Sequence, residues 1–361
     1  MPTKFDIADI CAEDALLLCC ARTRIEEETA NQIKILIHHG INWRYLVRSA
    51  IYHRVAPLLY QSLRQTSLKS IPPAVANKLQ HHYKAIAGRN LFLTAKLLQI
   101  IDLLEAHHIP AIPYKGPALA FLAYGDVTLR QFGDLDILVH PHDYLTTQNL
   151  FLAHGYRLAV DWGWECSLVD NSHGICVDLH QGIMPEKFRF HLDFQSLQQR
   201  LEALPLAGGK IKTFYPEDML LILCIQLVKD GLESNPLRLI KVCDIAELLQ
   251  KHPDLDWERV LKRVRSLGCP QLLLVGLSVT HRLLGTPVPE LPLRPVTSPN
   301  LGDLNVHICH KIIHKVGYHR FNLTLVPNER DRALLTLPES LSALYYFIRP
   351  IRLTRDYSRL A

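Results

Sequence analysis

The sequence changes character between residues 109 and 139, which read IPAIPYKGPALAFLAYGDVTLRQFGDLDILV. The apolar, proline-bounded segment 109–114 is typical of an edge or entry strand, where proline is tolerated. Lys115-Gly116-Pro117 follows and leads into 118–124, which we expect to be helical. Apolar alternation over 135–140 predicts the next strand. This order of strand, glycine turn, helix and strand predicts a small core that contains a sheet.

Two carboxylates, Asp134 and Asp136, stand at alternate positions of that second strand. Alternate side chains share a face, so both acids point the same way while the apolar residues between them face the core. Aspartate is disfavoured in strands and costly to bury, so two on one face require a compensating cation. Mg²⁺ is bound by one or two carboxylates together with substrate phosphates. A divalent-metal site is one interpretation, and a solvated sheet edge is the other.

The residues before the acidic pair favour an anionic ligand. Gly116 lies between a strand and a helix, and Pro117 occupies the favoured first helical position. Backbone amides at such a helix start, together with the helix dipole, suit a phosphate group. Lys115 adds a mobile positive charge. Arg130, four residues before Asp134, is expected to clamp a phosphate, or alternatively to pair with a core carboxylate.

A third carboxylate is present on a later predicted strand, 175–180. Cys176, Asp178 and His180 share one face of this strand, and apolar residues share the other. If this strand lies beside the one that carries Asp134 and Asp136, Asp178 can complete a metal site or accept a proton from an attacking hydroxyl. An ordinary polar face is the alternative.

These segments together resemble the uncharacterised bacterial nucleotidyltransferase family of the DNA polymerase β-like nucleotidyltransferase superfamily. The resemblance covers approximately residues 5–265 and is most specific over 109–116, 134–139 and 177–180. It implies transfer of an NMP from an NTP with Mg²⁺ or Mn²⁺ as the metal. Most superfamily members have Gly-Ser where this chain has Lys115-Gly116, so a serine contact to phosphate is not carried over.

The resemblance also implies roles for particular residues. It makes Asp134 and Asp136 metal ligands and Asp178 the third carboxylate of the catalytic and metal-binding set. Lys229 is included among the nucleotide-binding residues because helices after the core cover the nucleotide in related enzymes. The alternative is that this lysine lies at a solvated helix end. The residues expected to bind nucleotide are Lys115, Gly116, Arg130, His180 and Lys229.

The fold class predicted from these patterns is α+β. We expect a small mixed-sheet nucleotidyltransferase core at 105–215, flanked by an N-terminal helical region at 1–104 and a C-terminal helical region at 216–361. His307, Cys309, His310 and His314 have the spacing of one helical face, for which a zinc site and surface histidines are alternatives. An arginine-rich and tyrosine-rich tail follows beyond residue 345, and its role is left open.

Composition limits the possible partners. Forty Lys and Arg against 35 Asp and Glu give a net charge of +5, which suits an anionic substrate and mildly disfavours a wide nucleic-acid groove. Nine cysteines without a CxxC pair, and no signal peptide, predict free thiols in the cytoplasm, away from the membrane. The expected acceptor is a hydroxyl of a small molecule or peptide. The alternatives are a tRNA-type or toxin-like transferase and a non-catalytic nucleotide-binding protein.

Overall fold

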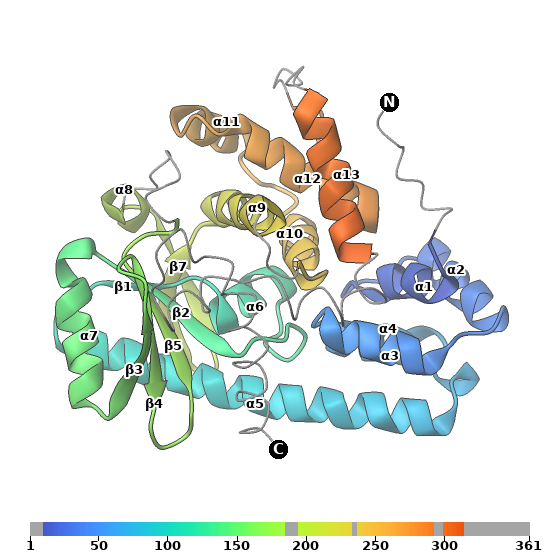
Figure 1. Ribbon diagram of the computed structural model, residues 1–361, viewed down its shortest axis with the longest axis horizontal. Coiled ribbons are helices and arrows are strands. Elements are labelled where there is room, and N and C mark those ends of the chain that lie inside the picture. The colour runs from blue at the N-terminus through green and yellow to red at the C-terminus, as the bar shows by residue number, and fades with distance from the viewer. Residues whose placement is uncertain (1–9, 185–193, 233–236, 292–298, 314–361) are drawn as a thin grey trace, which may run out of the picture.

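The computed structural model of the protein describes residues 10–184, 194–232, 237–291 and 299–313. Its α+β architecture confirms the predicted fold class, with a mixed sheet set among helices (Figure 1). The amino-terminal part is helical, as expected. Its elements are α1 (Ala12–Cys20), α2 (Glu27–His38), α3 (Trp43–Tyr52), α4 (Ala56–Thr66), the short η2 (Leu68–Ser70) and α5 (Pro73–Ala106).

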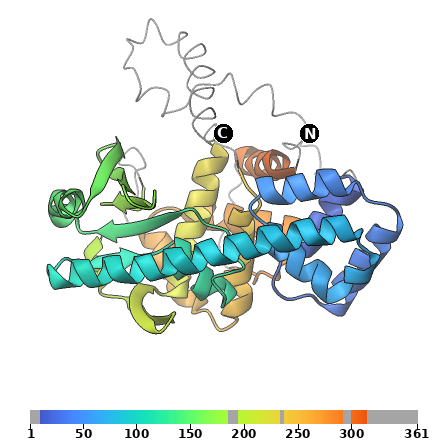
Figure 2. The same cartoon turned by 90° about the horizontal axis from the view of Figure 1, so that it is seen from below.

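Helix α5 has 34 residues and runs along the molecule from the amino-terminal helices to the sheet (Figures 1 and 2). At 1.5 Å per residue it is about 50 Å long. It packs against α4 near one end and against β1, β2 and β7 further along. The predicted boundary at residue 104 therefore places α5 in the amino-terminal region, although this helix also packs against the sheet. The division into three regions stays a prediction.

The central sheet has five strands in the order β1-β2-β5-β4-β3. Strands β2 and β5 pair in parallel, and the other neighbours pair antiparallel. Three of the strands, β1, β2 and β5, lie close to the positions predicted above, whereas β4 and the separate hairpin β6–β7 were not predicted. The strands are β1 (Ala111–Pro113), β2 (Asp134–Val139), β3 (Tyr156–Asp161), β4 (Glu165–Asp170), β5 (Cys176–His180), β6 (Leu201–Leu206) and β7 (Gly209–Phe214).

The remaining helices cover the sheet and form the carboxyl-terminal part of the described chain (Figure 1). Helix α6 contacts β2 and α10, and α9 contacts β7 and α12. These elements are α6 (Gly116–Tyr124), η3 (Pro141–Asp143), α7 (Tyr144–Ala153), α8 (Phe194–Gln198), α9 (Pro216–Leu232), α10 (Ile240–Lys251), α11 (Trp257–Ser266), α12 (Pro270–Leu284) and α13 (Pro299–Ile313).

One continuous apolar core connects the sheet with the helices on both sides, and its largest fully buried side chains include Tyr114, Phe151 and Phe214. All nine cysteines are free thiols. In the described ranges, no helix combines the length and apolarity that a membrane span requires. His314 and the arginine-rich tail lie outside the described residues.

Candidate active site

The two acidic motifs lie on neighbouring strands. Because β2 and β5 are parallel, Asp136 stands directly opposite Asp178, and Asp134 stands opposite Cys176. The condition set for Asp178, that its strand lies beside the Asp134-Leu135-Asp136 strand, is therefore met. Opposed residues of two adjacent strands project from the same face of the sheet, so the register brings Asp136 and Asp178 together.

Asp136 is the most enclosed of the three acids, with 6% of its side chain exposed. The ammonium of Lys115 donates to its Oδ1 at 2.7 Å, and Nε2 of His180 lies 3.3 Å from the same oxygen. Burial alone would raise the pKa of Asp136, but the charge of Lys115 and the hydrogen bond from His180 outweigh it and hold the pKa well below its usual value. Asp136 is therefore a permanently charged anion at neutral pH.

His180 joins two carboxylates. Its Nε2 faces Asp136, and its Nδ1 lies 3.1 Å from Oε2 of Glu165 on β4. Burial would lower the pKa of His180, but Asp136 and Glu165 together raise it above its usual value. Its ring packs edge-on against Tyr114 and is tilted against Trp164. His180 lies beside Asp136, and its predicted role in nucleotide binding stays a prediction. Glu165 was missed because its strand was not recognised.

Asp178 has a different environment from Asp136. Its Oδ1 accepts a hydrogen bond from the hydroxyl of Ser167 at 2.6 Å, and the thiol of Cys176 lies 3.4 Å away. Burial and the negative charge of Asp136 raise its pKa to about 6. The two facing acids thus differ widely in basicity, and Asp178 is the one able to exchange a proton near neutral pH.

Gly116 connects β1 to α6 at the edge of this cluster. Its φ of +52° lies in the left-handed region that disfavours side chains, and a Cβ there would stand 3.1 Å from the carbonyl oxygen of Asp134. Lys115 is the residue that precedes the helix, and Pro117 occupies its first turn. The turn therefore holds Lys115 and the start of α6 against the strand that carries Asp134.

Arg130 is bonded to a core carboxylate. Its Nε and Nη2 donate to the two carboxylate oxygens of Asp244 on α10 at 2.7 and 2.9 Å, and Tyr124 donates to the same carboxylate at 2.8 Å. Arg130 is 8% exposed and Asp244 is 2% exposed. A guanidinium engaged in this way has little freedom to clamp a phosphate, so the pairing favours the structural alternative, and the nucleotide-binding role of Arg130 stays a prediction.

Lys229, near the end of α9, lies at the rim of the site. Its ammonium is 6.0 Å from the centre of the Trp164 ring, which in turn packs on His180. It is also 3.8 Å from the carboxylate of Asp230, which pairs with Lys241 as well. At this distance Lys229 is only loosely paired, and 19% of its side chain is exposed.

The donor set fits a hard divalent cation. Three carboxylates on one sheet face, two of them directly opposed, supply the oxygen ligands that Mg²⁺ prefers. Among the described residues, no group of three or more His, Cys, Asp or Glu is already gathered around one point. Mg²⁺ does not need such a cage, because it is usually held by one or two carboxylates plus substrate phosphates. In the described part of the chain, no such group surrounds His307 and His310.

Comparison with known proteins identifies the family. The profile of a family described as uncharacterised nucleotidyltransferase matches residues 39–285, which is 285 − 39 + 1 = 247 of the 361 residues. The chain belongs to this family, and it is an NTP-dependent transferase. A comparison with curated proteins gives no match.

Three solved structures share a likeness with this chain. The antibiotic-resistance factor ANT(2'')-Ia is 14% identical with a TM-score of 0.36, over 48% of this chain and 92% of its own. The lincosamide antibiotic adenylyltransferase LnuA is 18% identical with a TM-score of 0.33, over 43% and 94%. An antigenic nucleotidyltransferase-like protein from Paracoccidioides brasiliensis is 19% identical with a TM-score of 0.34, over 56% and 93%.

Proposed function

We propose that the protein transfers an NMP from an NTP to a hydroxyl group of a small molecule or peptide, with Mg²⁺ held by Asp134, Asp136 and Asp178. The observation that carries this proposal is the parallel register that sets Asp136 opposite Asp178, with Asp134 two residues away on the same face. Mn²⁺ prefers similar oxygen ligands and would serve in place of Mg²⁺. The free thiols are in keeping with a reaction in the cytoplasm.

In the proposed reaction, the acceptor oxygen forms a bond to the α-phosphorus as the bond from that phosphorus to the β-phosphate oxygen breaks, and pyrophosphate leaves. The hydroxyl proton goes to the carboxylate of Asp178, whose pKa of about 6 leaves it mostly ionised at pH 7. When bound, the divalent cation neutralises charge on the phosphates that these acids would otherwise repel.

Two basic groups of the chain are suited to hold the phosphates. Lys115 is 25% exposed and reaches Asp136 through a single contact, so its flexible side chain can exchange that oxygen for a phosphate. The left-handed turn at Gly116 keeps a bare backbone at the start of α6, where the helix dipole favours an anion. Lys229, beside Trp164, adds a second mobile cation at the rim.

The proposal is tested with Asp136→Asn, which preserves shape and removes charge. We expect this variant to lose NMP transfer and Mg²⁺-dependent pyrophosphate release from labelled NTPs while its circular dichroism spectrum stays unchanged. Asp102→Asn, an exposed position on α5, is the matched control and should retain activity. Equal turnover by Asp136→Asn and the wild type would remove the catalytic assignment. NTP binding without turnover in the wild type would favour a non-catalytic nucleotide-binding protein instead.

A further inference from the structure

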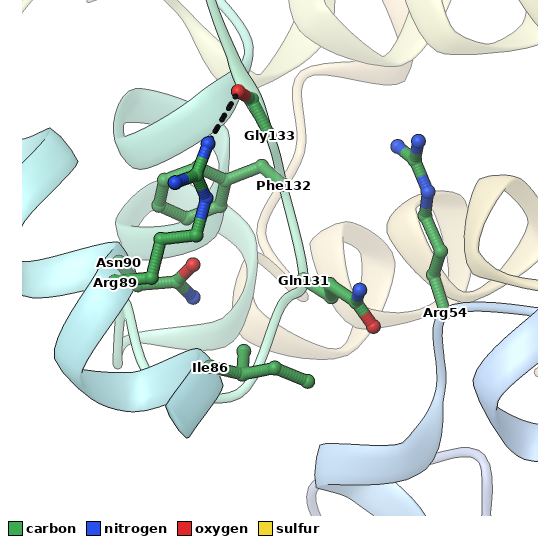
Figure 3. A pocket seen from close by; sticks show the side chains of 7 residues that line it. All are labelled: Arg54, Ile86, Arg89, Asn90, Gln131, Phe132 and Gly133. Atoms are coloured by element: carbon green, nitrogen blue, oxygen red, sulfur yellow. Dashed lines mark hydrogen bonds between the residues drawn. The ribbon is translucent and has the colours of Figure 1, made fainter. Parts of the chain in front are cut away.

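A cavity of about 140 Å³ lies beside the strand that carries the acidic pair. It is lined by Arg54, Ile86, Arg89, Asn90, Gln131, Phe132 and Gly133 (Figure 3). Gly133 directly precedes Asp134, and the ring of Phe132 would contact a Cβ at Gly116. The cavity therefore adjoins the candidate active site without including its three carboxylates.

Arg54 supplies an uncommitted positive charge to this cavity. Within the described ranges its side chain forms no hydrogen bond or ion pair, whereas one guanidinium nitrogen of Arg89 donates to the carbonyl of Gly133 at 3.5 Å. Burial and the nearby charge of Arg238 lower the pKa of Arg54, and the charges of Asp134 and Asp136 partly offset this effect. An anion bound in the cavity would relieve the unbalanced charge, because no carboxylate lines its wall.

The position of Arg54 is fixed by a specific anchor. It has a φ of +60°, an uncommon conformation for a residue with a side chain. The preceding His53 is buried, its Nδ1 accepts a hydrogen bond from the amide of Leu239 at 3.1 Å, and its carbonyl accepts one from Ile240 at 3.3 Å. The start of α10 thus holds this turn in place, and Arg54 lies on the side of the cavity opposite Arg89 and Phe132 (Figure 3).

The wall of the cavity is held in place by Asn90. This residue is fully buried, and its Nδ2 donates to the carbonyls of Val127 and Arg130, which fixes the loop that leads to Gln131 and Phe132. The two arginines that line the cavity therefore stand on a firm frame, and none of the three carboxylates is part of its wall.

We propose that this cavity binds the phosphate end of a phosphorylated, hydroxyl-bearing acceptor such as a sugar phosphate. This inference rests on the proposed function and names the class of its acceptor. Arg54 and Arg89 bind the phosphate, and the remainder of the molecule extends toward the acids with its acceptor hydroxyl. A cavity of about 140 Å³ has room for a phosphate with a few attached atoms.

The test is calorimetric titration of the full chain with glycerol 3-phosphate, ribose 5-phosphate, glucose 6-phosphate and their unphosphorylated parents. We expect at least one phosphorylated compound to bind tenfold or more tightly than its parent. Arg54→Asn, an exchange that tolerates the left-handed backbone, should weaken that binding by about 10- to 100-fold, as loss of a charged hydrogen bond does. Arg48→Asn, an exposed arginine on α3, is the matched control and should bind normally.

Equal binding of all phosphorylated compounds and their parents would overturn the proposal. So would a fall in ATP affinity, rather than sugar phosphate affinity, in Arg54→Asn, because the site would then belong to the nucleotide. Arg89→Ala provides a second variant if Arg54→Asn does not fold. These binding measurements do not need turnover, so they are separate from failure of the proposed function, which shows as absence of both ATP binding and pyrophosphate release.

Discussion

The pairing of Arg130 with Asp244 makes a quantitative prediction about stability. Arg130→Met keeps an apolar side chain of similar length but leaves Asp244 buried with the hydroxyl of Tyr124 as its remaining side-chain donor. Removing one partner of a buried, bidentate pair costs about 3–5 kcal/mol, because the other charge stays uncompensated. A folded protein is stabilised by about 5–15 kcal/mol in total, so this variant should be strongly weakened.

A double variant separates the ion pair from simple side-chain volume. Arg130→Met combined with Asp244→Leu removes both charges, and such replacements are often neutral or stabilising. We therefore expect the double variant to recover most of the lost free energy of unfolding. The resulting coupling energy between the two positions should be at least about 2 kcal/mol.

Urea unfolding followed by tryptophan fluorescence, together with ATP titration of the same preparations, measures both quantities. The structural role requires that Arg130→Met unfolds at a lower urea concentration while the ATP affinity of the folded fraction remains that of the wild type. A loss below about 1 kcal/mol, combined with ATP binding weakened tenfold or more, would refute the structural role and restore the phosphate role.

Three further predictions concern single contacts. Transfer activity should fall toward acidic pH, because Asp178 must be ionised to accept a proton. Ser167→Ala should move this limb of the pH–rate profile to higher pH, because it removes a hydrogen bond that stabilises the carboxylate. Gly116→Ala should lower the free energy of unfolding by about 1–2 kcal/mol because of its left-handed backbone, and denaturant unfolding measures this; an unchanged midpoint would contradict it. Asn42→Ala removes the N-cap of α3, where the side-chain Oδ1 accepts a hydrogen bond from the amide of Tyr45 at 3.1 Å. It should lower the free energy of unfolding by about 1 kcal/mol in the same assay.

The parts of the site that sequence predicts are those fixed by local geometry. Period-two alternation is enough to place Asp134 and Asp136 on one face, and Asp178 and His180 on another. Glycine between a strand and a helix is enough to indicate a left-handed turn. These features depend on neighbours within a few residues, so they hold whatever the remainder of the chain does.

The parts that sequence could not supply depend on distant partners. Glu165 belongs to a strand whose polar and apolar residues alternate only over 165–168, and the antiparallel pairing that sets it opposite His180 brings it to the site. Asp244 is 114 positions away from Arg130 and reaches it because α10 packs against α6. Nothing local distinguishes Asp244 from other acids on a helix.

The contrast between Lys115 and Arg130 shows how burial decides the use of a basic residue near an acidic pair. Both precede Asp136 by fewer than 25 positions, and both were expected to bind phosphate. Arg130 is buried and donates two hydrogen bonds to the carboxylate of Asp244. Breaking this pair would leave two buried charges without a partner. Lys115 makes one hydrogen bond from a flexible side chain that is 25% exposed, so its ammonium can turn to a phosphate once a bound cation compensates the charge of the buried Asp136. The loosely held cation is therefore the one available to a substrate, and the tightly held one supports the loop that leads to the acids.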